Sequence, residues 1–126
     1  VTGGGVTLVN LANQLTGEDA GTKIVKNALK APLLHILENA GLNAQALLAA
    51  VENAKPGQGI NVMEPEKGLQ DLKKAGVIDP ARVTREAVQN AISIAATAIT
   101  MGALIVELPE KADNSAAAGA GMGGIY

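Results

Sequence analysis

The sequence predicts a mainly α-helical, multihelical domain with a small β-hairpin and one C-terminal strand. Three observations predict this fold class. Apolar residues recur every three to four positions over most of the chain, the spacing of a helix face packed on a core. Phe and Trp are absent and Tyr126 is the only aromatic residue, so the core has to be built from aliphatic side chains. Asp79-Pro80 stands before the longest periodic stretch, where an N-cap and a first-turn proline belong.

The chain opens on a glycine triplet, 3–5, that leads into a first helix of roughly three turns. Residues 16–21 form a polar break. The next periodic stretch, 24–40, contains Pro32, so we expect one helix to end near Ala31 and another to begin directly after it. Gly41 then closes the second helix as its C′ residue.

Asn43 is expected to cap a helix that runs through Ala54, with an apolar face formed by Ala46, Leu47, Ala50 and Val51. After a turn-rich loop, residues 60–63 and the residues following Gly68 flank the sequence EPEKG and predict a small hairpin. A short helical connection then brings the chain to Asp79.

Asp79 is expected to cap the last helix, one face of which is predicted to be buried: Val83, Ala87, Ala91, Ile94, Ala95, Ala98 and Ile99. Residues 103–108 predict a strand buried on both faces, with partners outside this segment. We assign residues 1–111 to one domain and 112–126 to a disordered tail rich in Gly, Ala and Met.

Composition narrows the function classes. A net charge of −2 gives no electrostatic case for nucleic acid or an anionic membrane. The absence of cysteine and the single histidine exclude a disulfide framework, a thiolate nucleophile and a multi-histidine metal site. Residues 91–106 carry no charge but contain four Ser, Thr or Gly residues, which favours a core helix over a membrane span. The first residues show no secretion signal. We interpret the chain as a piece of a longer polypeptide.

Most single signals have a plain structural interpretation. Glu18-Asp19 and the Glu64/Glu66 pair lie in turns and are expected to be solvated loop charges. His35 has no ligand partner at the right spacing and is expected at the surface or an interface. A bare glycine triplet usually marks a tight helix entry, and Asp79 is explained by capping alone, although a carboxylate can serve a helix start and a ligand together.

Five stretches together resemble the C-terminal part of the group I chaperonins, the GroEL-type bacterial family: GGGVTL, APLLHILENAG, AGVIDPARVTREAVQNAISIAA, ELPEK and the Gly-Met-Gly-Gly tail. The resemblance covers essentially the whole chain in unbroken order. It implies the C-terminal half of an equatorial domain, which is mostly helical, binds ATP and makes most of the ring contacts in that family.

The resemblance also implies nucleotide contacts. Gly4 matches the middle glycine of the family's triplet, and Asp79 matches the aspartate that hydrogen-bonds the ribose. Asn61, Val62 and Met63 match the hairpin segment beside the adenine, although the family prefers a small residue and an aromatic around that asparagine and has a hairpin about two residues shorter. Methionine can still pack on an adenine face because it is flexible and polarizable.

The parts of the family that are missing here limit the functional expectation. Its phosphate-binding loop, its catalytic aspartate and the ligands for Mg and K ions do not match this segment, so no catalytic residue is assigned and ATP hydrolysis by this chain alone is not expected. The parent protein would be a cytoplasmic ring oligomer that binds a co-chaperonin and unfolded polypeptides through other domains.

The leading hypothesis is therefore part of an ATP-dependent folding chaperonin that supplies the adenine and ribose side of the site and ring contacts. The alternative is a structural and oligomerisation module that binds no nucleotide on its own. A free-standing helical adaptor is a third possibility.

Overall fold

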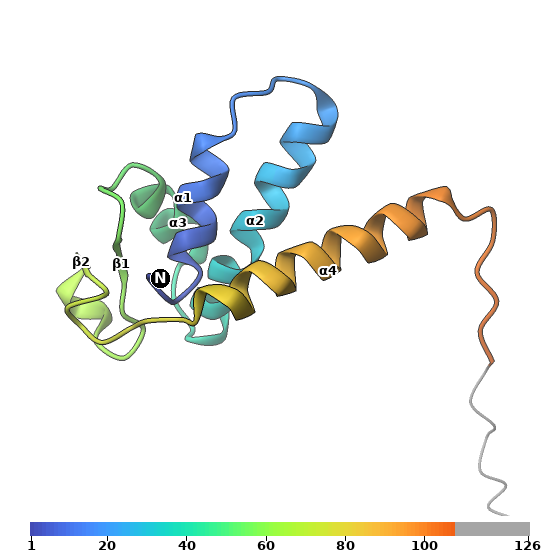
Figure 1. Ribbon diagram of the computed structural model, residues 1–126. Coiled ribbons are helices and arrows are strands. Elements are labelled where there is room, and N and C mark those ends of the chain that lie inside the picture. Colours follow the sequence, from blue (N-terminus) through green and yellow to red (C-terminus); the bar gives the residue numbers. More distant parts are fainter. Residues whose placement is uncertain (108–126) are drawn as a thin grey trace, which may run out of the picture.

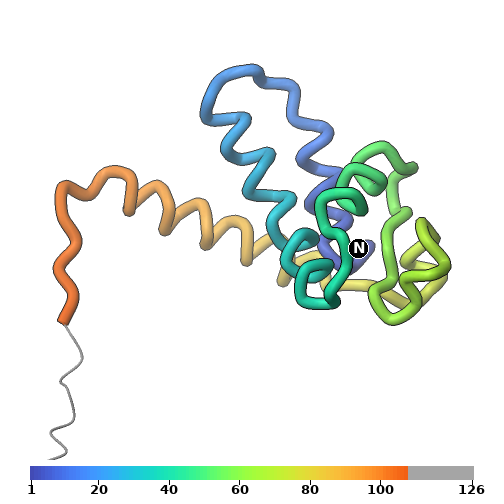
Figure 2. Tube along the Cα trace, turned by 180° about the vertical axis from the view of Figure 1, so that it is seen from behind, coloured from blue at the N-terminus to red at the C-terminus, as the bar shows by residue number. Residues whose placement is uncertain are grey.

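A computed structural model describes residues 1–107. Three helices form the body, and a two-stranded hairpin covers one side of it (Figure 1). A fourth helix leaves the body at its base and projects away from it in both views (Figures 1 and 2). The elements are α1 (Val6–Gln14), α2 (Ala20–Asn39), α3 (Ala44–Glu52), β1 (Gln58–Ile60), the 3₁₀ helix η1 (Pro65–Lys67), β2 (Leu69–Asp71) and α4 (Ala81–Thr100). The mainly helical fold class with a small hairpin is confirmed.

The core lies where α1, α2 and α3 meet under the hairpin. It is aliphatic throughout, as the composition requires, and consists of Val6, Val9, Leu33, Leu37, Ala44, Leu48, Val51, Ile60 and Leu72. Leu72 follows β2 and is fully buried, so the hairpin and the connection after it are anchored to the helices. The free energy of this packing comes from many small aliphatic contacts and from no single large side chain.

Helix α2 runs without a break through Pro32, so the prediction of two helices separated at Ala31 is wrong. A proline removes one hydrogen bond of the helical ladder, the bond from its own nitrogen, and the other bonds can survive around it. Leu33, directly after the proline, and Leu37, one turn later, are both buried in the core. Their packing holds the second half of α2 in line with the first.

The caps predicted at Gly41 and Asn43 are both present. The Gly41 N–H donates to the Glu38 carbonyl at 2.9 Å and the Leu42 N–H to the Leu37 carbonyl at 3.0 Å, which is a Schellman motif with Gly41 at φ 71°. The Asn43 side chain accepts from the Ala46 N–H at 3.3 Å and caps α3. Both predictions are confirmed.

The apolar face predicted for α3 is partly wrong. The buried residues are Ala44, Leu48 and Val51, whereas Ala46 is exposed. The helix ends at Glu52, two residues before Ala54, within the usual uncertainty of helix boundaries.

Strands β1 and β2 pair antiparallel, with Gly59 opposite Gln70 and Ile60 opposite Leu69. The predicted hairpin is therefore present, but its first strand is Gln58–Ile60 and ends where the predicted strand began. Residues 61–68 form the connection, which includes η1.

The largest difference from the sequence prediction lies in helix α4. None of its residues is buried, although a buried face and a core helix were predicted. Ile94 is 71% exposed and Ile99 is 84% exposed. The helical period shows correctly that α4 is amphipathic, but no element of residues 1–107 covers its apolar face.

The two ends of α4 also differ from expectation. The N-cap residue is Pro80, with ψ 121°, and it has no side-chain cap, so the prediction that Asp79 caps this helix is wrong. Residues 103–107 form no strand, because a strand needs a hydrogen-bonded neighbour and none is present in the part that the structure describes. The tail predicted over 112–126 lies outside the described residues.

Candidate functional site

The N-terminal residues pair with the segment that leads into α4. Thr2 and Ile78 form an antiparallel bridge, the Gly3 N–H donates to the Val77 carbonyl at 3.0 Å, and the Asp79 N–H donates to the Val1 carbonyl at 3.1 Å. Thr2 is buried, and its carbonyl accepts from the Thr7 hydroxyl at 2.7 Å. The entry into α1 and the entry into α4 are therefore held side by side.

This pairing brings Asp79 against the glycine triplet. A Cβ atom built on Gly3 would lie 3.1 Å from Oδ1 of Asp79 and 3.1 Å from the Ile78 backbone. The carboxylate thus lies over the bare Cα of Gly3 and remains exposed to solvent. The backbone of Asp79 is paired with Val1, and its side chain makes no capping hydrogen bond to α4, whose N-cap is Pro80.

Gly4 follows Gly3 in the chain and has φ 65°. Gly5 is the N-cap of α1, has φ 78° and makes no side-chain cap hydrogen bond. The start of α1 therefore has no capping side chain, and part of its first turn is satisfied by the backbone, since the Val6 N–H donates to the Gly3 carbonyl at 3.3 Å and the Leu8 N–H to the Gly5 carbonyl at 3.2 Å.

The segment after β1 is held by its own asparagine. Oδ1 of Asn61 accepts from the Met63 N–H at 3.1 Å, and the Asn61 carbonyl accepts from the Glu64 N–H at 3.0 Å. This leaves the Asn61 NH₂ group as the part of the side chain that can donate to a ligand. Val62 packs against the core, whereas the Met63 side chain is 84% exposed.

Charged side chains flank this segment. Lys67 Nζ lies 2.7 Å from Oε1 of Glu64. The hydrogen bond that Lys67 donates to the Glu64 carboxylate, reinforced by the negative charge of that carboxylate, raises the pKa of Lys67. The pair is solvated and closes the connection between the strands without adding a net charge beside Asn61.

The structure therefore brings Asp79 against Gly3, the chain neighbour of the predicted site residue Gly4, whereas Gly4 itself lies near Val77 and Leu72. Asn61, Val62 and Met63 are tied to the same body through β1, but no contact joins them directly to Asp79. The role of Gly3 as the residue under the carboxylate was missed, since the contact depends on a pairing between segments far apart in the sequence.

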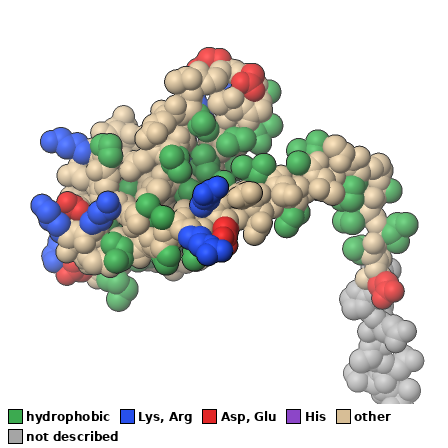
Figure 3. Space-filling model, viewed as in Figure 1, with side chains coloured by type: hydrophobic (Ala, Val, Ile, Leu, Met, Phe, Trp, Pro, Cys, Tyr) green, Lys and Arg blue, Asp and Glu red, His purple; other side chains and the backbone are tan. Residues whose placement is uncertain are grey.

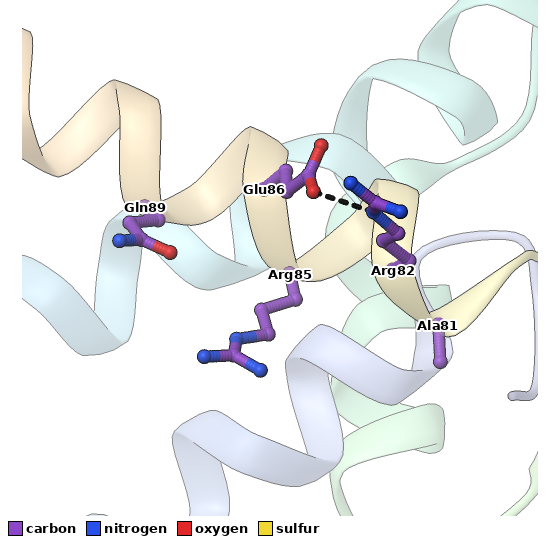
Figure 4. A pocket seen from close by; sticks show the side chains of 5 residues that line it. All are labelled: Ala81, Arg82, Arg85, Glu86 and Gln89. Atoms are coloured by element: carbon purple, nitrogen blue, oxygen red, sulfur yellow. Dashed lines mark hydrogen bonds and ion pairs between the residues drawn. The ribbon is translucent and has the colours of Figure 1, made fainter.

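A separate polar patch lies on the first turns of α4. Its residues are Ala81, Arg82, Arg85, Glu86 and Gln89, all from one helix (Figure 4). Arg82 Nε lies 2.7 Å from Oε1 of Glu86, and both side chains are largely exposed. An exposed pair of this kind contributes about 0–1 kcal/mol. With no wall from another element, the patch is a solvated helix face.

Within the described residues, no group of three or more His, Asp or Glu side chains is placed to hold a metal ion. None of the helices in residues 1–107 combines the length and the hydropathy that a membrane span requires.

Residues 1–109 match the family model of the TCP-1/cpn60 chaperonin family. The chain belongs to the TCP-1/cpn60 chaperonin family. Among solved structures, this chaperonin segment is similar to the open-state monomer of a group II chaperonin from Methanococcoides burtonii, with a TM-score of 0.65 and 24% sequence identity. The match covers 80% of this chain and 28% of the archaeal one, so the segment spans well under a third of that chaperonin's length.

Proposed function

We propose that this chain is part of a GroEL-type, group I chaperonin equatorial domain and supplies the adenine and ribose side of its ATP site. Family membership supports a chaperonin role, and the sequence motifs quoted above favour group I. The observation that carries the site is the Asp79 carboxylate, which lies against Gly3 at the uncapped start of α1.

The residues fit the base and sugar of a nucleotide better than its phosphates. Asp79 offers carboxylate oxygens that accept hydrogen bonds from ribose hydroxyls. Gly4 allows a sugar or a base to approach the backbone, and Asn61 and Met63 offer an amide donor and an apolar cover for the adenine. A complete ATP would supply the phosphate and metal interactions that drive domain movement, and no residue described here is proposed to hold those groups.

The test is a calorimetric titration of adenosine, ADP and ATP into the chain. We expect weak binding of adenosine, with a Kd of about 1 mM, which corresponds to about −4 kcal/mol. All three ligands should bind alike if only the base and the ribose are recognised. Asp79→Ala should abolish adenosine binding. The wild-type protein should likewise fail to bind 2′,3′-dideoxyadenosine, which lacks the 2′ and 3′ hydroxyls.

Glu18→Ala provides the matched control, because it also removes one exposed carboxylate but lies in the loop before α2. It should bind adenosine as the wild type does. If Asp79→Ala also binds unchanged, the ribose role is wrong. If no variant binds at about 10 mM adenosine, the proposal of a preformed half-site fails.

A second function has its own supporting observation. The apolar face of α4 and the apolar residues after it are exposed, with Ile105 at 94%. Surfaces of this kind mark association sites in soluble proteins. On this alternative, the chain is a structural and oligomerisation module that contributes ring or chain contacts and binds no nucleotide by itself.

A further inference from the structure

Residues 1–3 are hydrogen-bonded on two sides. On one side their backbone pairs with residues 77–79, and on the other side it is bonded to the start of α1. Thr2 stands opposite Ile78, between the two backbone hydrogen bonds of the pairing. At this position of an antiparallel pair, a residue directs its own N–H and carbonyl away from the partner strand. The Thr2 carbonyl therefore needs a donor from the side of α1.

Thr7 supplies this donor. Its hydroxyl, in the first turn of α1, donates to the carbonyl of the buried Thr2 at 2.7 Å. A second hydrogen bond on this side, from the Val6 N–H to the Gly3 carbonyl, is longer, at 3.3 Å. Because a buried carbonyl that loses its donor is unfavourable, the Thr7 hydroxyl is a principal attachment of residues 1–3 to the helix.

This contact differs from those of the threonines in α4. The hydroxyls of Thr97 and Thr100 each donate to the carbonyl four residues earlier, at 3.1 Å and 3.3 Å. Bonds of that kind remain within one helix and connect it to nothing else. The hydroxyl of Thr7 instead reaches back across the glycine triplet to a carbonyl outside α1. It therefore joins the helix to the segment that pairs with residues 77–79.

The Asp79 carboxylate depends on this backbone pairing for its position. Within residues 1–107 it forms no ion pair, and it makes no capping hydrogen bond to α4. Arg82, at the start of α4, is paired with Glu86 at 2.7 Å, and Figure 3 shows basic and acidic side chains next to each other where the helix leaves the body. The place of the carboxylate over Gly3 is therefore set by the backbone that carries it.

We propose that Thr7 is a positioning residue for Asp79. Its hydroxyl holds the Thr2 carbonyl, and the pairing of this segment with the residues before α4 then keeps the carboxylate over Gly3. Thr7 does not contact the nucleoside and acts only through this backbone. The inference deepens the nucleoside role proposed above and rests on it for the ligand, whereas the attachment through Thr7 can be measured without any ligand.

Amide hydrogen exchange followed by NMR tests the attachment. Thr7→Val removes the hydroxyl and keeps the branched shape of the side chain. The Gly3 and Asp79 amides, which donate across the pairing, should exchange about tenfold faster in this variant. Thr7→Ser keeps the hydroxyl and should restore both rates to within about twofold of the wild type. Thr97→Val removes a hydroxyl bond that stays within α4 and should leave both rates unchanged.

Val51→Ala separates this local effect from a general loss of stability. Val51 is buried in the core on α3, so its truncation lowers the stability of the whole fold and leaves the pairing of residues 1–3 in place. It should accelerate exchange at the Leu37 amide in the core and leave the Gly3 and Asp79 amides unchanged, because these two exchange through local opening of a short pairing.

An NMR titration with adenosine then tests the consequence for binding. Thr7→Val should raise the Kd of adenosine about fivefold, less than the complete loss expected of Asp79→Ala, because the carboxylate is displaced and not removed. Thr7→Ser and Thr97→Val should bind adenosine as the wild type does.

Unchanged exchange of Gly3 and Asp79 in Thr7→Val overturns the attachment, and a Thr7→Ser chain that behaves like Thr7→Val overturns the role of the hydroxyl. Faster exchange with an unchanged adenosine Kd overturns the positioning of the carboxylate. A wild-type chain that binds no adenosine at about 10 mM contradicts the nucleoside role instead, and the exchange rates alone then decide the attachment through Thr7.

Discussion

The backbone of Gly5 lies directly against the backbone of Leu33. A Cβ atom on Gly5 would be 2.8 Å from the Leu33 nitrogen and 3.0 Å from its Cα, and Gly5 also has φ 78°. Helices α1 and α2 can approach this closely only because residue 5 has no side chain. The position joins the start of α1 to the residue that follows Pro32.

We expect Gly5→Ala to lower the free energy of unfolding by about 3 kcal/mol, because left-handed strain and overpacking add at this site. Gly41→Ala is the matched control, with φ 71° but open space around the position of the new methyl group. It should cost only the strain, about 1 kcal/mol. Urea denaturation followed by circular dichroism measures both, and equal losses would contradict the close approach.

Lys30 and Glu52 form the ion pair that links α2 to α3. Their charged groups lie 2.6 Å apart, and each side chain is only about a quarter exposed, at 24% and 27%. Apart from this ammonium group, Oε1 of Glu52 has no hydrogen-bond donor among the described residues. Lys30→Met should therefore lower the free energy of unfolding by about 1–3 kcal/mol, because it leaves a poorly hydrated carboxylate without a partner.

Arg82→Met is the control for this pair, since it removes a cation from the exposed contact with Glu86. Its effect should stay within about 0.5 kcal/mol. A double variant of Lys30→Met with Glu52→Gln should recover part of the loss. If the single substitutions at the two sites have the same effect, the burial of the Lys30 pair contributes nothing.

Asp19 caps α2, and its carboxylate accepts from the Thr22 N–H at 2.9 Å and from the Thr22 hydroxyl at 2.6 Å. These hydrogen bonds, led by the one from the hydroxyl, lower the pKa of Asp19 below its ordinary value of 3.8. A lowered pKa in the folded state means that the charged carboxylate stabilises the fold above about pH 4. This contribution is lost as the pH falls through the folded pKa.

The measurement is the melting temperature of wild type and of Asp19→Asn from pH 7 down to pH 2.5. Asparagine keeps the capping oxygen without the charge. The wild type should melt higher at neutral pH, and the difference should disappear in the acid range. A difference that does not change with pH would show that the charge has no part in the cap.

Pro32 stands inside α2 and removes one hydrogen bond of its ladder. Pro32→Ala restores a donor and should raise the free energy of unfolding by about 1–2 kcal/mol, after the larger conformational entropy of the unfolded chain is subtracted. Ala31→Gly, one position earlier, is the control in the opposite direction and should cost about 1 kcal/mol. A loss of stability in Pro32→Ala would show that the proline ring makes packing contacts that an alanine methyl group cannot replace.

The local parts of this fold were predictable because neighbouring residues determine them. Gly41 and Asn43 act through their own backbone and side-chain hydrogen bonds, and both were placed correctly from the sequence. Asp19 follows the same chemistry but was interpreted as a loop charge. The signal was available, since Thr22 stands three residues after it at the distance that a capping interaction requires.

The errors arise where distant contacts override a local signal. Asp79-Pro80 has the pattern of a cap, but the helix begins one residue later, with Pro80 as its N-cap, and the backbone of Asp79 pairs with Val1 instead. The period of α4 shows which residues share a face and says nothing about what covers that face. The contact of Gly3 with Asp79 follows from the Thr2–Ile78 bridge, which no local pattern predicts. From the sequence, only the family resemblance grouped Gly4 with Asp79.

The junction at Asp79 determines how α4 is attached to the body. The helix is about 30 Å long, and it is attached to the body through residues that are hydrogen-bonded to the N-terminal segment. A displacement of its far end by about 10 Å corresponds to a rotation of roughly 20° at its base. Because the hydrogen bonds of Val1 and Gly3 to this segment are the attachments nearest to the helix, a rotation of α4 would strain these bonds first.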